Sequence, residues 1–184
     1  NNSAYPFAVV KPSAIGSFKL YQKMGAVHKL ITSEQLIWTA MQQRFEQLAA
    51  AAAQAAVVLI IDAEESWIQD GVDLLVLPLL VKYNCDKIVV ALTIQLYLKD
   101  RNLVFKRLLK DADEKGYVLG VKLVRGAYME KERSRAAALK ISAPVCETKD
   151  ATDVQYRDAL QNAMQALNRH FCIVATHNQS DINW

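Results

Sequence analysis

The 184-residue sequence lacks several features that mark specialised protein classes. Its longest apolar runs, Val57–Ile61 and Leu74–Val81, fall far short of the roughly 20 residues that a membrane-spanning helix needs. Residues Asn1–Pro6 have neither the basic start nor the apolar core of a signal peptide. With 22 Lys and Arg against 19 Asp and Glu, the net charge is only +3, which excludes a polybasic nucleic-acid arm. We therefore expect one globular domain, or part of a larger one, with no transmembrane segment and no nucleic-acid partner.

Cysteine is also scarce. The three cysteines, Cys85, Cys146 and Cys172, are an odd number and show neither C-x-x-C nor Cys/His metal spacing. This usage predicts unpaired structural thiols in a reducing compartment, and no metal site. A glycine-rich phosphate loop is missing as well after the first apolar run.

The sequence does contain short apolar runs that alternate with helix-length segments. Strands are predicted at Phe7–Val10, Val57–Ile61, Lys87–Leu92, Tyr117–Val124 and Phe171–Ala175. The first, second and fifth are close to uninterrupted apolar sequence, which is typical of strands buried on both faces of a parallel sheet. Helices are predicted at Ser33–Ala56, Asp73–Tyr83, Leu98–Lys115 and Asp150–Arg169. The first of these follows a Thr32-x-x-Gln35 capping box. This alternation predicts an α/β fold, either a doubly wound sheet or a TIM-type barrel.

Polar or charged residues follow every predicted strand. They are Lys11–Ser13, Asp62–Ser66, Thr93–Gln95, Lys122–Tyr128 and Thr176–Asn178. In a barrel the carboxyl ends of parallel strands converge on one rim, so these groups would line one pocket. Any one of them could be a solvated loop or a helix cap, but five in phase favour a site.

Five segments resemble, in order, motifs of the FAD-dependent proline dehydrogenases. They are Phe7–Ala14, Ile61–Ser66, Thr93–Leu98, Gly120–Arg133 and Ala175–Asn178. The resemblance implies a modified (βα)8 barrel that holds FAD on its carboxyl-terminal rim. It also implies oxidation of L-proline to Δ1-pyrroline-5-carboxylate, with the electrons passed to membrane quinone. The expected location is cytoplasmic with peripheral membrane association in a bacterium, or the matrix side of the inner mitochondrial membrane in a eukaryote.

The resemblance also implies roles for individual residues. On the substrate side, Lys11 would pair with the proline carboxylate, Asp62 would organise the site, and Tyr128 would form a wall, with Leu123 as apolar packing. On the cofactor side the implied residues are Gln95, Lys122, Arg125, Gly126, Thr176, His177 and Asn178. Some family members carry arginine where this chain has Lys122, and lysine keeps the charge but loses the planar fork.

Only about five of the eight barrel units are recognised in residues 1–184. The family continues with strands that bear a substrate-contacting tyrosine, and with a helix that bears two adjacent arginines. We therefore expect a partial proline dehydrogenase barrel domain that belongs to a longer protein. An open part of a barrel exposes strand edges, so self-association is a further expectation.

Two other functions stay open at this point. A Schiff-base lyase on a TIM barrel would use Lys11 or Lys122 as its nucleophile. Alternatively, the chain is a catalytically empty barrel fragment that acts only by association with itself or a partner.

Overall fold

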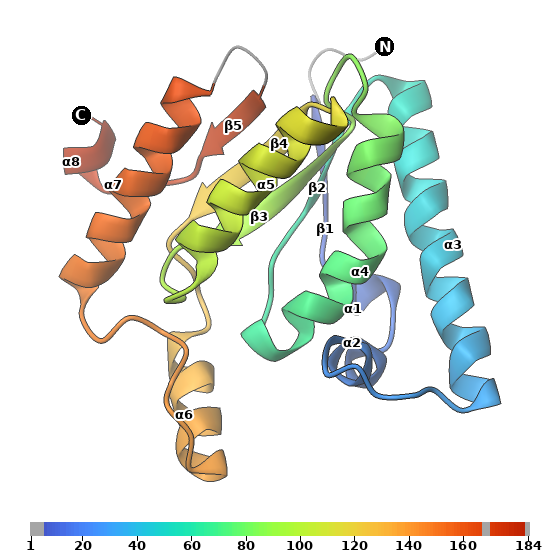
Figure 1. The fold of residues 1–184 in the computed structure, drawn as a ribbon, viewed down its shortest axis with the longest axis horizontal. Helices are drawn as coiled ribbons and strands as arrows, with labels where there is room; N and C mark the ends of the chain where they lie inside the picture. The colour runs from blue at the N-terminus through green and yellow to red at the C-terminus, as the bar shows by residue number, and fades with distance from the viewer. Residues whose placement is uncertain (1–5, 167–169, 183–184) are drawn as a thin grey trace.

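The computed structural model of the chain describes residues 6–166 and 170–182. At its centre is one sheet of five parallel strands, whose order in the sheet follows the order in the chain (Figure 1). The strands are β1 (Phe7–Val10), β2 (Val58–Ile61), β3 (Val90–Gln95), β4 (Leu119–Val124) and β5 (His170–Val174). A doubly wound sheet needs a reversal of strand order, and the described strands show none. The barrel-type alternative is therefore confirmed, and the doubly wound alternative is wrong.

The helices that connect these strands cover the sheet. Within the described ranges they are α1 (Pro12–Ile15), α2 (Phe18–Gly25), α3 (Thr32–Ala55), α4 (Ser66–Tyr83), α5 (Arg101–Lys115), α6 (Met129–Leu139), α7 (Lys149–Gln165) and α8 (Gln179–Ile182). The long helices α3, α4, α5 and α7 lie along one face of the sheet (Figure 1). Over the same described ranges, no helix is both long and apolar enough to cross a bilayer.

The hydrophobic core lies between the sheet and these helices. Side chains alternate between the two faces of a strand, and Ile61, Leu92 and Val121 are register partners that all belong to the core. On each strand, the residues that alternate with these core residues point to the opposite face of the sheet. Lys122, next to Val121, is one of them, and this face is the inner wall of the curved sheet. The alternation thus places apolar side chains under the helices and leaves the inner wall for polar groups at the strand ends.

The sheet is strongly curved. Phe7 on β1 and Phe171 on β5 have ring centroids only 6.3 Å apart, although three strands separate them. In a flat sheet with about 4.8 Å between strands, residues on these two strands would be roughly 19 Å apart. The two rings therefore meet across the inside of a barrel-like wall.

The expectation that the first and fifth strands are buried on both faces is wrong. On β1, Phe7 is 43% exposed and Val9 is 58% exposed, while Val174 on β5 is 44% exposed. These strands form the two edges of the described sheet, so one side of each has no neighbouring strand. The central strand β3, in contrast, is buried along its whole length.

The helix starts differ from the sequence prediction by one to seven residues. Helix α5 begins at Arg101 instead of Leu98, which pairs with Val145 in a β-bridge. Helix α3 begins at Thr32, and Glu34 caps it in place of the predicted Thr32–Gln35 box, because Glu34 Oε2 accepts a hydrogen bond from Ile31 N at 3.0 Å. Helix α4 begins at Ser66, well before the predicted Asp73, and runs through Gly71. A Cβ at this glycine would lie 2.0 Å from the backbone oxygen of Tyr21, so the glycine is required for close packing of α2 on α4.

Tertiary contacts explain other differences at element ends. Strand β3 begins at Val90 instead of Lys87. The fully buried Asn84 accepts hydrogen bonds from Val89 N and Val90 N and donates to Val90 O and Val118 O, which fixes where β3 starts. Helices α2 and α6 were not predicted, and the predicted end of the last long helix at Arg169 lies outside the described residues.

Candidate active site

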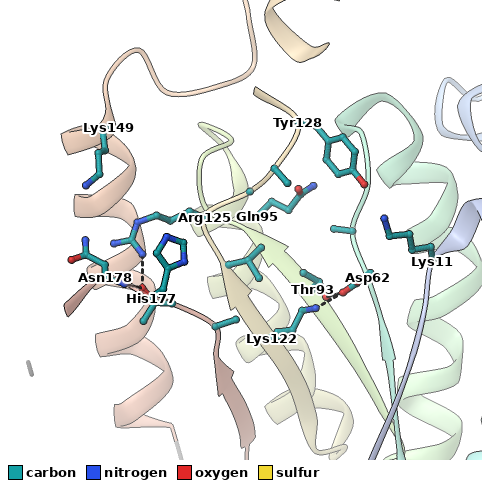
Figure 2. Close-up of a pocket in the computed structure, with 16 residues that line it drawn as sticks. Lys11, Asp62, Thr93, Gln95, Lys122, Arg125, Tyr128, Lys149, His177 and Asn178 are labelled. Atoms are coloured by element: carbon teal, nitrogen blue, oxygen red, sulfur yellow. Dashed lines mark hydrogen bonds and ion pairs between the residues drawn. The ribbon is translucent and has the colours of Figure 1, made fainter. Parts of the chain in front are cut away.

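The carboxyl ends of all five strands open onto one cavity of about 550 Å³ (Figure 2). It is lined by Lys11, Asp62, Ala63, Thr93, Gln95, Lys122, Val124, Arg125, Gly126, Ala127, Tyr128, Lys149, Ala175, Thr176, His177 and Asn178. This size lies within the range of about 300–1,000 Å³ that is usual for small-molecule and cofactor sites. The convergence of strand ends expected from the sequence is therefore confirmed.

Lys11 is the cation at the end of β1. Its side chain is exposed, and its ammonium has no hydrogen bond or ion pair among the described residues, although its backbone oxygen accepts from Ala14 N at 3.0 Å. The next turn is held by Glu64, whose carboxylate accepts from Ser13 N at 2.8 Å and from Ser13 Oγ at 2.7 Å. The backbone around Lys11 is thus anchored while its ammonium stays available to a ligand.

Asp62 and Lys122 form an ion pair on the inner wall of the sheet. Thr93, on the strand between them, donates a hydrogen bond from Oγ1 to Asp62 Oδ1 at 3.4 Å. The Lys122 and Asp62 side chains are 18% and 24% exposed. Pairing removes much of the cost of keeping these charges beside apolar strands.

Gln95 lies at the end of β3 and is almost completely buried, with 3% exposure. Its Nε2 donates to the backbone oxygen of Glu64 at 2.7 Å, which fixes the orientation of the amide. Glu64 therefore connects the loops that follow β1, β2 and β3, because it binds both Ser13 and Gln95.

Arg125 is the centre of a second polar cluster at the end of β4. Its Nε donates to Asp153 Oδ1 at 2.6 Å, and its Nη2 donates to Asp181. Its Nη1 donates to Thr176 Oγ1 at 2.9 Å. The guanidinium carbon also lies 4.3 Å from the centroid of the Tyr156 ring, a favourable cation–π distance. Arg125 thus joins β4 to α7 and to the loop after β5.

The two carboxylates of this cluster are held ionised. Burial would raise the pKa of Asp181, but hydrogen bonds from Arg125 and Arg157 outweigh it and hold the pKa below the usual range. Burial likewise opposes ionisation of Asp153, yet hydrogen bonds from Lys149 and Arg125 lower its pKa. With three cations, Arg125, Lys149 and Arg157, against these two carboxylates, the cluster carries a net charge of +1 near neutral pH.

Gly126 and Tyr128 follow Arg125 at the mouth of the cavity. Gly126 has φ +133°, and a Cβ there would lie 2.0 Å from the Tyr97 ring, so only glycine fits. Tyr128 is half-buried and occupies the N-cap position of α6, without a capping hydrogen bond from its side chain. In Figure 2 the hydroxyl end of Tyr128 and the ammonium of Lys11 point toward each other.

The segment after β5 completes the rim. Thr176 Oγ1 accepts from Arg125 and also from the backbone N of Asn178 at 3.1 Å, which shapes the turn. The side chain of His177 is exposed at the cavity, on the same side as Arg125 (Figure 2).

Leu123 is the one predicted site residue that does not reach the cavity. It is fully buried in the core between the sheet and the helices. Its neighbour Lys122 faces the inner wall, and side chains alternate, so Leu123 faces the opposite way. Sequence reasoning also missed Lys149 and Asp153, which reach the site from α7 and follow no strand end. No local pattern marks these two residues.

Comparison with known proteins identifies the relatives of this chain. The family model described as proline dehydrogenase matches residues 5–184. The carbapenem antibiotics biosynthesis protein CarD of Pectobacterium carotovorum is 34% identical over 177 residues, which are 96% of this chain and 46% of that protein. The human mitochondrial proline dehydrogenase 1 is 34% identical over 154 residues, which are 82% of this chain and 26% of that protein.

Solved structures show the same fold. A crystal structure of a variant of Bradyrhizobium japonicum proline utilization A (PutA) matches with a TM-score of 0.81 and 24% identity. The match covers 96% of this chain and 17% of that chain. The chain therefore spans less than half the length of these relatives.

Proposed function

The chain belongs to the proline dehydrogenase family, and we propose that the protein containing it oxidises L-proline to Δ1-pyrroline-5-carboxylate with FAD, passing the electrons to membrane quinone. One observation carries the proposal. All five segments that resemble the family's motifs bring polar side chains to the same cavity, at the carboxyl ends of the strands. Ligands of open and closed parallel sheets bind at that end.

We assign the substrate side to Lys11, Asp62 and Tyr128. The Lys11 ammonium has no hydrogen-bond or ion-pair partner among the described residues, so it can bind the carboxylate of proline. Tyr128 would cover the pyrrolidine ring with its apolar face. Asp62 would act through its ion pair with Lys122, which holds the inner wall in one arrangement.

The residues at the other side of the cavity fit FAD. Two of the cations that line the cavity, Arg125 and Lys149, lie on this side, while the Lys122 ammonium points toward Asp62 (Figure 2). Such a wall suits a cofactor that carries a diphosphate and a ring with several acceptors. We assign Gln95 and Lys122 to the flavin ring, and Arg125, Gly126, Thr176, His177 and Asn178 to the rest of the cofactor.

The reaction removes a hydride from the carbon beside the proline nitrogen, and a proton passes from that nitrogen to solvent, so that a C=N bond forms. When bound, FAD would accept the hydride and its two electrons. Lys11 would hold the proline carboxylate, and Tyr128 would cover the pyrrolidine ring. Gln95 and Lys122 would present hydrogen-bond donors to the flavin ring.

We further propose that residues 1–184 form the first five units of an eight-stranded barrel. The longer protein would supply the remaining strands, a substrate-contacting tyrosine and an arginine pair. The proposed location follows from the electron acceptor, which is a membrane quinone. It is the matrix side of the inner mitochondrial membrane in a eukaryote, and the cytoplasmic side of the membrane in a bacterium.

The test uses the full-length polypeptide that contains this sequence. We expect it to purify with a flavin absorbance spectrum and to reduce a quinone only when L-proline is added. Borohydride trapping of a carbonyl substrate on a lysine, without flavin, would instead favour the Schiff-base lyase. A full-length protein that neither binds FAD nor traps a carbonyl would favour the catalytically empty alternative.

A further inference from the structure

Helix α6 docks on the first turn of α4 through three side-chain contacts. We call this contact the α4–α6 latch, and it comprises Glu65, Ser66 and Trp67 with Lys131, Glu132 and Arg135. Lys131 Nζ lies 2.8 Å from Glu65 Oε1. The guanidinium carbon of Arg135 lies 4.7 Å from the Trp67 ring centroid. The N-cap residue of α4 and the first two residues of the helix thus each contact a residue of α6.

Glu132 is the buried centre of the latch. Its side chain accepts hydrogen bonds from Ser66 N at 2.6 Å and from Ser66 Oγ at 2.7 Å, and the residue is 1% exposed. The residue that precedes α4, Glu65, makes no side-chain cap of its own. Glu132 therefore caps α4 from another helix, with its negative charge at the positive end of the helix dipole.

The latch connects two walls of the cavity. On the α6 side, Glu132 lies one helical turn after Tyr128, and Glu132 N donates to Tyr128 O at 2.9 Å. Lys131 Nζ also lies 5.2 Å from the centroid of the Tyr128 ring. On the α4 side, Ser66 follows Asp62 by four residues along the same loop. Asp62 and Tyr128 both line the cavity, so the bond between Glu132 and Ser66 fixes their relative positions.

We propose that Glu132 is a positioning residue, which binds Ser66 to hold the first turn of α6, and with it Tyr128, in place over the substrate. It touches neither substrate nor cofactor and acts only through Ser66 and Tyr128. The identity of the ligand as proline rests on the proposed function, whereas the latch itself rests on the contacts between α4 and α6.

The test compares Glu132→Gln with Glu130→Gln in the full-length polypeptide. Glu130 lies on the same helix but is exposed, so it is a matched control for the loss of one charge. Ser66→Ala is a milder second variant, because it removes the Oγ donor and keeps the backbone donor. Hydrogen exchange of the α6 amides reports the latch directly, and does not depend on any activity.

We expect faster exchange over residues 129–139 in Glu132→Gln and, to a smaller extent, in Ser66→Ala. We expect kcat/KM for proline to fall roughly 10- to 100-fold in Glu132→Gln, with most of the change in KM, because a displaced wall residue misplaces the substrate. Flavin content should stay at the unsubstituted level. The double variant with Ser66→Ala and Glu132→Gln should lower kcat/KM little further than Glu132→Gln alone, since both substitutions act on the same contact. Glu130→Gln should match the unsubstituted protein in all of these measurements.

Unchanged exchange of α6 in Glu132→Gln would overturn the latch. Faster exchange with an unchanged KM for proline would overturn the positioning role. A full loss of flavin together with activity would also overturn it, because Glu132 would then support the whole domain. If the unsubstituted protein does not oxidise proline, the proposed function fails, and the exchange of α6 decides the latch by itself.

Discussion

Lys122 on β4 and Asp62 at the end of β2 form an ion pair across the intervening strand β3. Thr93 of β3 donates to the same carboxylate oxygen, so three neighbouring strands meet at one group. The pair holds the Lys122 ammonium on the inner wall of the sheet, next to Asp62 and Thr93 (Figure 2). Lys122, which we assign to the flavin site, therefore also connects neighbouring strands of the sheet.

The first prediction follows from this pair. We expect Lys122→Met to reduce flavin retention or the rate of flavin reduction by proline. It should also lower the free energy of unfolding by about 1–3 kcal/mol, because Asp62 is left partly buried without its partner. Flavin absorbance and urea denaturation measure the two effects. Lys110→Met, at a mostly exposed lysine of α5, is the control. Normal flavin content with an unchanged reduction rate would remove Lys122 from the cofactor site.

The second prediction concerns the substrate carboxylate. We expect Lys11→Ala to raise KM for proline roughly ten- to hundredfold, because a charge-assisted hydrogen bond of about 1.5–3 kcal/mol is lost. Flavin content should change little, since Lys11 lies on the substrate side of the cavity (Figure 2). Steady-state kinetics on the full-length protein measure the effect, with the exposed Lys19→Ala as the control. A KM equal to that of the unsubstituted protein would show that Lys11 does not bind the substrate.

The third prediction concerns the free energy of unfolding at acidic pH. Asp181 has a lowered pKa in the folded state, so its stabilisation is present above the unfolded value of about 3.9 and is lost as the pH falls through the folded value. We expect Asp181→Asn to be less stable at neutral pH and to lose less stability below about pH 4. Urea denaturation across a pH series compares the two proteins. Parallel curves for the variant and the unsubstituted protein would show that the ionisation of Asp181 does not stabilise the fold.

The fourth prediction concerns the open sheet. Phe7 and Val9 leave apolar surface exposed on the inner wall, and β1 and β5 are edge strands in the described sheet. We expect a polypeptide of residues 1–184 alone to be oligomeric, aggregated or partly folded, and to show no proline oxidation. Size-exclusion chromatography with a flavin absorbance trace, and a proline and quinone assay, compare it with the full-length protein. A monodisperse, flavin-loaded and active monomer would contradict the inference from barrel closure.

Much of the fold could be predicted because it depends on local patterns. Uninterrupted apolar runs such as Val57–Ile61 mark strands, and the amphipathic stretch after Ile31 marks α3. The predicted ends were less accurate where a distant residue sets them. Asn84 fixes the start of β3. The close approach of the Tyr21 backbone explains why α4 carries a glycine at position 71.

The candidate site shows the same division. The alternation of side chains along a strand, together with the meeting of strand ends in a barrel, brings Lys11, Asp62, Lys122 and His177 to one cavity, as the sequence predicts. Their roles toward proline and FAD stay predictions. The same alternation turns Leu123 away, which follows from its position beside Lys122.

The strands, the order of the polar groups after them and the family could thus be predicted, because each depends on residues that are close in the chain. The pairing of the charges could not, because it depends on tertiary packing. Asp62 and Lys122, Arg125 and Asp181, and Ser66 and Glu132 are each separated by more than fifty residues. No local periodicity relates such positions, because their distance depends on how the sheet curves and on where α4, α6 and α7 pack. That packing leaves Lys11 available to a ligand and engages Lys122 and Arg125 with carboxylates.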